Sequence, residues 1–271
     1  MGAGDCDSAI VRLGAPALVG GVVVDTAWFT GNYPPHISVE AANVTGHPSV
    51  EELVHKTEWT PIVERSAVNG DTRNPFQVKS TQRWTHVRLS MYPDGGIARF
   101  RVHGEGLLDP SFAEALPLDL AALENGGRIT ACSNMFYSSP NNLLLPGTPR
   151  HMGEGWETSR RRDAGNDWVQ VHLANQGVLA AAELDTSYFV GNAPGWARLS
   201  GRDGTGDWFE LLPRTDLQPD TRHRFLIQDD RPVTEARLDI YPDGGMARLR
   251  LFGTLTSQGL QQVRQIWAAS S

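Results

Sequence analysis

Three polar side chains alternate along one short segment near the start of the sequence. His36, Ser38 and Glu40 are each separated by one apolar residue. An extended backbone therefore projects all three from the same face. A histidine titrates near neutral pH and a carboxylate accepts protons, so the group suits general acid–base chemistry or metal binding. The alternative is the solvated polar face of an ordinary strand.

A second concentration of charge combines an acid with a run of arginines. Glu157 is followed by Arg160, Arg161 and Arg162, and a guanidinium binds a carboxylate through two parallel hydrogen bonds. Adjacent arginines repel one another unless acids or an anionic ligand neutralise them. The run is therefore a candidate carboxylate-binding site. The alternative is a structural ion-pair cluster with Glu157 and the aspartates that follow.

Two aspartates occupy matching places in the two halves of the sequence, each just before a turn. Asp25 and Asp185 end apolar segments, a place where functional side chains are common. An aspartate there also accepts hydrogen bonds from the backbone of the turn, which is the structural alternative. Trp28 and Tyr188 match each other three residues later and are interpreted as packing residues.

These positions belong to a tandem repeat. Residues 25–34 match residues 185–194 at six of ten positions, an offset of 160. Residues 92–104 match residues 241–253 at nine of thirteen, an offset of 149, so the first copy has 11 more residues between the two blocks. Arg88 and two arginines of the second block also recur. Recurrence in both copies favours scaffold ion pairs over a single catalytic site.

When the two copies are aligned at the offset of 160, the first copy has no counterpart of the first part of the second copy. The segment 126–165 of the second copy would correspond to about 40 positions before residue 1, so we expect either a shortened chain or a start that lies further upstream. A sandwich without those strands exposes sheet edges and part of its core, which predicts that the first unit is the less stable. The predicted division is a first repeat at 1–109, a connector at 110–125, a second repeat at 126–257 and a C-terminal tail at 258–271.

Alternation of apolar and polar residues predicts strands around both blocks, as at 87–92 and 169–173. The residues Tyr92–Gly96 suit a hairpin turn, which predicts that the strands on either side pair and carry their arginines on a shared face. Helices are predicted at Ser49–His55, where Ser49 and Glu52 form a capping-box pattern, and at Gln258–Ala268. Many short strands between glycines and prolines favour an all-β antiparallel sandwich or jelly roll.

Composition excludes several classes of protein. A net charge of −7 argues against nucleic-acid binding. Without an apolar run of about 18 residues or a signal sequence, no membrane span is expected, and a cytoplasmic location is the default. Two cysteines are too few for a disulfide framework. No motif for an organic cofactor is present, whereas a divalent metal ion stays open because hydrolases often use one.

The motifs in their order closely resemble the allantoicase family. They are DTAWFTGNYPP at 25–35, THVRLSMYPDGGIARFRVHG at 85–104, SNMFYSSPNNLL at 133–144, GWETSRRR at 155–162 and DWVQVHL at 167–173. The sequence departs from the family pattern in three places. Ser159 replaces an arginine, Ala193 replaces a tyrosine, and the first copy has no counterpart of the segments at 133–144 and 155–162.

The resemblance implies a tandem repeat of two galactose-binding-like jelly-roll sandwiches and hydrolysis of allantoate to ureidoglycolate and urea during purine degradation. Allantoate carries a carboxylate and two ureido groups on one carbon, so its site needs a guanidinium, hydrogen-bond partners and proton-transferring groups. The expected catalytic residues are His36, Glu40 and Asp25. The expected substrate-binding residues are Glu157, Arg160, Arg161, Arg88 and Asn32. A homo-oligomer is expected to shield the open sheet edge. The alternatives are a non-catalytic carbohydrate-binding module and an inactive remnant.

Overall fold

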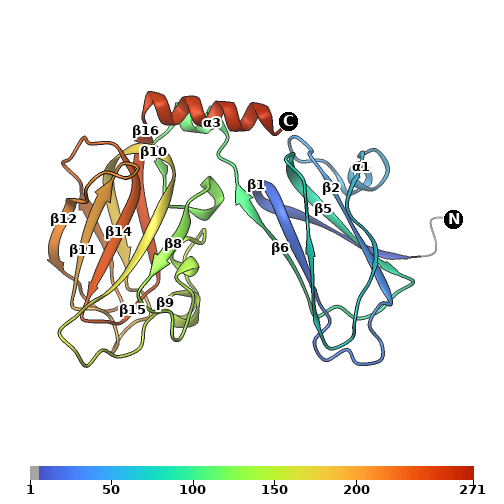
Figure 1. The fold of residues 1–271 in the computed structure, drawn as a ribbon, viewed down its shortest axis with the longest axis horizontal. Coiled ribbons are helices and arrows are strands. Elements are labelled where there is room, and N and C mark those ends of the chain that lie inside the picture. Colours follow the sequence, from blue (N-terminus) through green and yellow to red (C-terminus); the bar gives the residue numbers. More distant parts are fainter. Residues whose placement is uncertain (1–5) are drawn as a thin grey trace. The chain divides into compact units, whose positions relative to one another are not determined.

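The structure is a computed structural model that describes residues 6–271. It divides into two compact units, one reaching to Leu107 and including the last four residues, the other running from Leu108 to Trp267. Both units are antiparallel β-sandwiches, so the predicted all-β fold with two copies is confirmed (Figure 1). The boundaries given for the repeats and the connector stay a prediction. None of the described helices is both long and apolar enough to cross a membrane.

The first unit contains one short helix among its strands. The elements are β1 (Asp7–Asp25), β2 (His36–Ala42), α1 (Val50–His55), β3 (Thr60–Ala67), β4 (Arg73–Gln77), β5 (Arg83–Tyr92) and β6 (Arg99–Gly106). The predicted helix at Ser49–His55 is confirmed. The Ser49 hydroxyl accepts a hydrogen bond from the Glu52 amide at 3.2 Å, and the Glu52 carboxylate accepts one from the Ser49 amide at 2.9 Å, which is the capping box.

The second unit has the same six strands and further segments in front of them. The preceding elements are α2 (Pro110–Ala115), β7 (Leu118–Asp119), η1 (Leu123–Asn125), β8 (Arg128–Cys132), η2 (Pro140–Leu144), η3 (Met152–Glu154) and β9 (Trp156–Glu157). The repeated strands are β10 (Asp167–Asp185), β11 (Trp196–Arg202), β12 (Phe209–Asp216), β13 (Arg222–Leu226), β14 (Val233–Tyr241) and β16 (Arg248–Leu255), with the short β15 (Gly245–Met246) between the last two. The chain ends with α3 (Ser257–Ala269), so the predicted C-terminal helix is confirmed.

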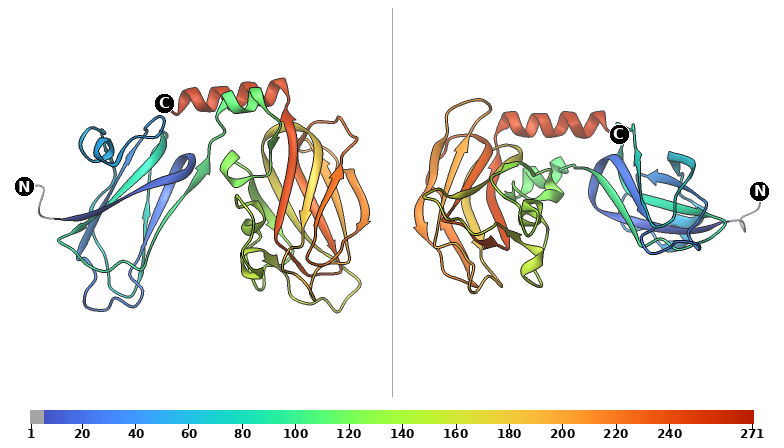
Figure 2. Two further views of the ribbon diagram at one scale, coloured as in Figure 1. Left: turned by 180° about the vertical axis from the view of Figure 1, so that it is seen from behind. Right: turned by 60° about the horizontal axis from the view of Figure 1, so that its bottom comes forward.

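One long strand in each unit belongs to both layers of the sandwich (Figure 2). The first half of β10 pairs with β14 and β8, and after a register shift between His172 and Gly177 its second half pairs with β16 and β13. The first half of β1 pairs with β5, and its second half pairs with β6 and β4. A local irregularity of this kind bends the strand so that it can pass from one sheet to the other.

The turn at Tyr92–Gly96 does not close a hairpin, so that prediction is wrong. Among the described residues β5 pairs with β1 and β2, whereas β6 pairs with the other half of β1. The turn therefore carries the chain from one layer to the opposite one, and Arg88 shares no face with Arg99 and Arg101. The turn residues specify a reversal of direction, but the apolar faces of the two strands decide which sheets they join.

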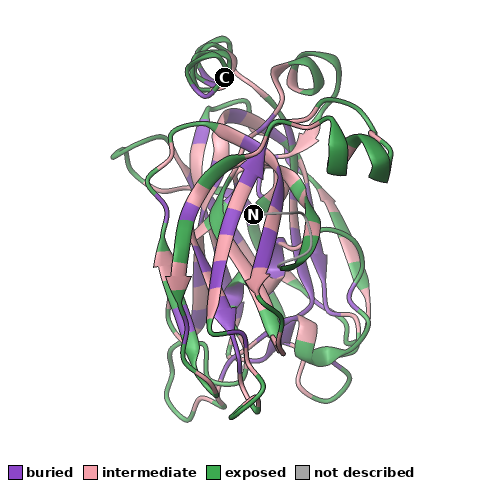
Figure 3. Cartoon of the chain, turned by 90° about the vertical axis from the view of Figure 1, so that its right-hand side faces the viewer, coloured by how far each residue is buried: buried purple, intermediate pink, exposed green. Residues whose placement is uncertain are grey.

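The second unit has the larger core. Its main cluster contains 24 buried apolar residues and that of the first unit 12, counted over residues 6–271. The two copies differ most at the first half of the long strand, since Val171 is 0% exposed and its counterpart Val11 is 42% exposed. In the second unit β8 and the buried Trp156 cover this region, and the described part of the first unit has no counterpart of them. Figure 3 shows buried positions along the strands and exposed ones in the loops.

The interpretation of Trp28 and Tyr188 as packing residues is wrong. Trp28 is 89% exposed and Tyr188 is also exposed, and both have a positive φ, 71° and 69°. This backbone conformation turns the side chain away from the sandwich. The next residue packs inward in its place, as the fully buried Phe189 shows.

Candidate functional site

The outer face of β2 carries the polar group predicted from the sequence. Ile37 and Val39 are fully buried, whereas His36, Ser38 and Glu40 are half-buried on the opposite side of the strand. The predicted projection of these three side chains from one face is therefore confirmed. Strand β5 lies beside β2 and contributes its own outward side chains to the same face.

Glu40 is held by an ion pair with Arg88, the residue directly opposite on β5. The Nε and Nη2 atoms of Arg88 both lie 2.7 Å from Oε2 of Glu40. The guanidinium of Arg88 also lies 4.7 Å from the centre of the Trp59 ring, a cation–π contact. These contacts fix the Glu40 carboxylate on the face and occupy the charge of Arg88.

His36 lies at the other end of this face. It is opposite Tyr92, whose hydroxyl is 2.9 Å from the Ser38 hydroxyl and whose ring is 4.3 Å below the guanidinium of Arg65. No hydrogen bond to the His36 side chain occurs within residues 6–271. Four residues of extended strand separate His36 from Glu40, about 13 Å. The structure thus places both on one face without bringing them into contact.

Asp25 ends β1 in the other layer and touches neither His36 nor Glu40. Its carboxylate is buried and accepts a hydrogen bond from the Ala27 amide at 3.1 Å and one from Arg101 at 3.1 Å, with Arg73 at 3.8 Å. The bond from the Ala27 amide, followed by that from Arg101, lowers the pKa of Asp25. Asp185 accepts the Ser187 amide in the same way at 2.8 Å. Both aspartates therefore bind the backbone of the turn, as the structural alternative predicts.

One arginine of the run in the second unit is neutralised by aspartates. The Arg161 guanidinium contacts Asp163 at 3.0 Å and Asp167 at 2.6 Å. The hydrogen bond from Arg161 to Asp163 is the main reason that the pKa of Arg161 is raised. Arg160 and Arg162 are exposed, and their guanidinium groups have no ion-pair partner among the described residues. Arg161 is thus engaged by two aspartates, whereas the side chain of Arg160 is exposed.

Glu157 does not neutralise the arginines; it pairs with the turn that follows β10. The amide of Asn192 donates a hydrogen bond to the Glu157 carboxylate at 2.6 Å. The counterpart of Asn192 in the first copy is Asn32, which is exposed and whose side chain has no hydrogen-bond partner among the described residues. The backbone carbonyl of Asn32 accepts a bond from the Gly96 amide at 2.7 Å. Among the described residues, the asparagine of the second copy is bound by an acidic side chain and that of the first copy is not.

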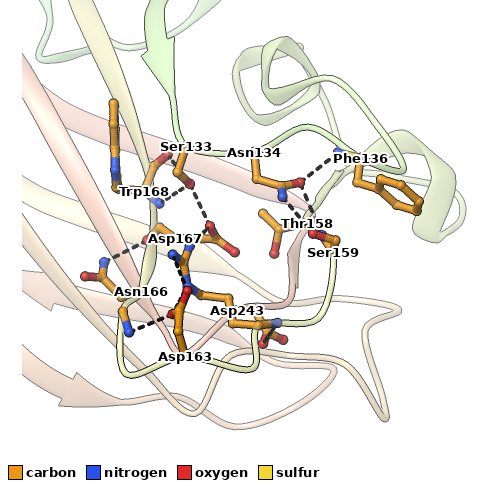
Figure 4. Close-up of polar contacts among 12 residues, drawn as sticks. Ser133, Asn134, Phe136, Thr158, Ser159, Asp163, Asn166, Asp167, Trp168 and Asp243 are labelled. Carbon is orange, nitrogen blue, oxygen red and sulfur yellow. Dashed lines mark hydrogen bonds and ion pairs between the residues drawn. The ribbon is translucent and has the colours of Figure 1, made fainter.

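Hydrogen bonds within the second unit hold the segment that carries the arginines. The side chain of Asn134 donates to the Ser159 hydroxyl at 2.7 Å and accepts from the Ser159 amide at 3.2 Å (Figure 4). Ser159 stands where the resemblance predicts an arginine, so this departure contributes to the loop itself. Asp167 nearby is fully buried, and one of its oxygens, Oδ2, has no hydrogen-bond partner.

A groove that sequence reasoning missed lies on the outer face of the first unit, between the β1–β5 pair and α1. Its volume is about 530 Å³. Ser8, Ile10 and Arg12 of β1 line it, together with His86 of β5. Its wall is formed by residues around α1: His47, Pro48, Val50, Leu53 and Val54.

The polar side chains of this groove are a histidine at its floor and an arginine at its rim. His86 is 3% exposed, and its Nδ1 lies 2.9 Å from the Thr85 hydroxyl. Burial, with a smaller contribution from Arg12, lowers the pKa of His86, so the imidazole is neutral at pH 7. Arg12 is exposed, and its Nη1 lies 2.7 Å from Nδ1 of His47.

Two signals in the sequence could have revealed the groove. The 11 additional residues of the first copy all fall between β2 and β3, where they form α1 and the segment before it. The second copy also has Glu235 at the place of His86. No group of three or more His, Cys, Asp or Glu side chains within residues 6–271 could hold a metal ion, so the metal left open by the sequence has no identified set of ligands.

Comparisons with known proteins agree on one family. The Allantoicase repeat family matches residues 2–107 and 118–256. The chain is 60% identical over 250 residues to a probable allantoicase of Nocardia farcinica, a match that covers 92% of this chain and 76% of the relative. It is 40% identical over 263 residues to an allantoicase of Dictyostelium discoideum, covering 91% and 71%. A crystal structure of allantoicase from Saccharomyces cerevisiae superposes with a TM-score of 0.83 at 34% identity, covering 92% and 77%. The chain belongs to the allantoicase family.

Proposed function

We propose that this chain hydrolyses allantoate to ureidoglycolate and urea in the breakdown of purines. The observation that carries the proposal is the family match across both repeats, with 60% identity to a probable allantoicase over 92% of the chain. In this reaction the oxygen of water bonds to the central carbon of allantoate, and the bond from that carbon to one ureido nitrogen breaks. A proton passes to the departing nitrogen, which leaves as urea.

The proposed proton-transferring groups are those of the outer face of the first unit. Glu40 is the first candidate, because two bonds from Arg88 hold its carboxylate in one orientation and a positioned carboxylate can activate water. His36 is the second, since its imidazole is not engaged by another described side chain. Asp25 is proposed as a positioning residue, because its bonds to Ala27 and Arg101 hold the turn that leads to β2.

The proposed substrate-binding groups are Arg88, Asn32, Glu157, Arg160 and Arg161. Arg160 and Asn32 have side chains without a partner within residues 6–271, so they can bind a ligand without first breaking a contact. Arg88, Arg161 and Glu157 are each engaged, and they contribute to binding only if those contacts open or if they position their neighbours.

Urea release from allantoate tests the proposal directly. We expect the purified chain to release urea, assayed with and without an added divalent metal ion, and Glu40→Gln to lower the rate by at least about 100-fold. The control is Arg99→Gln, an exposed arginine of the other layer, which should keep the rate of the original chain. Absence of urea release under both conditions would contradict the proposed activity and favour the alternative of an inactive remnant. Titration with galactosides would then test the carbohydrate-binding alternative.

The proposal includes a homo-oligomer that works in the cytoplasm. Val11 is exposed, and the edge of β1 beside it has no paired strand within residues 6–271, which favours a partner that covers both. Both cysteines are free thiols, which fits a reducing compartment. Sedimentation of the purified chain as a monomer at micromolar concentration would contradict the oligomer.

A further inference from the structure

The groove of the first unit lies beside the face that carries Glu40. Across the three neighbouring strands, the register aligns Ile10 of β1 with Arg88 of β5 and Glu40 of β2. Two residues along, Arg12 is aligned with His86. Neighbouring rows on one face of a strand are about 7 Å apart, so the row of Arg12 and His86 is next to the row of Arg88 and Glu40.

Hydrogen bonding determines which atom His86 presents to the groove. The Thr85 hydroxyl, which contacts Nδ1 of His86, is also within reach of two carbonyl oxygens, Ala42 at 3.2 Å and Val44 at 3.3 Å. We assign the hydroxyl proton to these carbonyls, which makes Nδ1 of the neutral ring the donor to Thr85 and leaves Nε2 as an acceptor. Nε2 has no hydrogen-bond partner among the described residues. A ligand with an N–H group can therefore bind there.

Arg12 supplies a complementary cation at the rim. Its guanidinium has five N–H donors on three nitrogens. His47 contacts one of these nitrogens, Nη1, and the other two remain for a ligand. The apolar side chains of Val50, Leu53 and Val54 form the opposite wall. An apolar wall excludes water from one side of a charge pair and so strengthens it.

The second unit contains none of these features. Its counterpart of Arg12 is His172, whose Nδ1 lies 2.7 Å from the carbonyl of Leu173. Its counterpart of His86 is Glu235, which is paired with Arg202. It also lacks α1, because β11 and β12 are joined by a short turn. The groove is therefore a property of the first copy and not of the repeated scaffold.

We propose that this groove binds the carboxylate end of a small ureido acid, with Arg12 on the carboxylate and Nε2 of His86 accepting a ureido N–H. The inference rests on the proposed function, since it assigns to the groove the recognition of the carboxylate and one ureido group of the substrate. It makes Arg12 and His86 specificity residues, neither of which recurs in the second copy.

Binding of N-carbamoylglycine tests the inference without turnover, because this compound has the carboxylate and only one ureido group. Isothermal titration calorimetry should show binding to the full chain and at least about tenfold weaker binding to Arg12→Gln, the loss of a charge-assisted pair. The uncharged amide of the same compound should bind weakly to both proteins. Arg99→Gln, an exposed arginine on β6, is the matched control and should bind N-carbamoylglycine like the original chain.

Two further variants keep the test independent of any effect of Arg12 on folding. Val54→Glu adds a negative charge at an exposed position of α1 and should weaken binding of N-carbamoylglycine about threefold through repulsion, without changing binding of the amide. His86→Phe should abolish the preference for N-carbamoylglycine over levulinate, a carboxylate of the same length without N–H groups.

The outcomes separate the inference from the proposed function. If the original chain does not bind N-carbamoylglycine, or if Arg12→Gln binds it equally well, the groove is not a carboxylate site and the inference is overturned, whether or not allantoate is hydrolysed. If binding depends on Arg12 but the chain releases no urea from allantoate, the recognition site is supported and the proposed activity is contradicted.

Discussion

At the scale of single residues, most charged side chains singled out from the sequence serve the scaffold. Arg161, Arg88 and Asp25 are all engaged in short ion pairs. Residue type and spacing predict which side chains share a strand face, as they did for His36 and Glu40. Residue type and spacing do not predict which strands pair. The alignment of Arg12 on β1 with His86 on β5 was therefore not predicted.

The ion pairs of Asp25 predict how the first unit responds to acid. The pKa of this carboxyl is lowered in the folded state, so it contributes stability above its unfolded pKa of about 3.9, and this contribution is lost as the pH falls through the lower folded value. Asp25→Asn should therefore lower stability at pH 7 and weaken the loss of stability below about pH 4. Urea denaturation from pH 2.5 to 7 measures both effects.

The matched control for this experiment is Asp94→Asn, an exposed aspartate in the turn after β5 whose side chain has no partner among the described residues. It should leave the acid dependence unchanged. Equal behaviour of the two variants would show that the contacts of Asp25 do not stabilise the folded unit.

At the scale of elements, the sequence predicted strands and helices where local chemistry decides them. The capping box at Ser49 and the alternation at 169–173 are local patterns, and both predictions were confirmed. The hairpin at Tyr92–Gly96 failed because strand pairing depends on the long strand β1, which lies more than 65 residues earlier in the sequence and bends between layers. The groove was missed because it needs the 11 additional residues to fold over a distant strand.

Val11 and Val171 occupy matching positions in the two long strands. The stability lost on truncating each side chain measures how far that position is covered. Val171→Ala should destabilise the second unit by about 1.5–3 kcal/mol, because Val171 is fully buried. Val11→Ala should change the stability of the first unit by less than about 0.5 kcal/mol in the monomeric chain, in which Val11 is 42% exposed. Denaturation of both variants measures the difference. A similar loss in the two would mean that Val11 is covered in solution, as the proposed oligomer requires.

At the scale of the whole molecule, the internal repeat predicted two related sandwiches of unequal completeness. The smaller core of the first unit supports the prediction that it is the less stable. We expect thermal unfolding in two transitions, with the lower one arising from the first unit. Trp84 is buried in that unit and Trp156 in the second, so Trp84→Phe should reduce the fluorescence change of the lower transition and Trp156→Phe that of the upper one.

The same repeat specifies a change that should raise the lower transition. Asp7 corresponds to Asp167 at the offset of 160, so a second copy of residues 126–166 joined directly before Asp7 enters the first unit in register. There its strand can pair with β1 as β8 pairs with β10, and its counterparts of Leu143, Leu144 and Trp156 can cover Val11, since these residues share a buried cluster with Val171 in the second unit. Burying that surface should raise the lower transition by several degrees. The control is the same extension with those three residues changed to serine, which retains the strand but not the apolar cover. If both extensions shift the transition equally, edge pairing and not apolar cover limits the stability of the first unit.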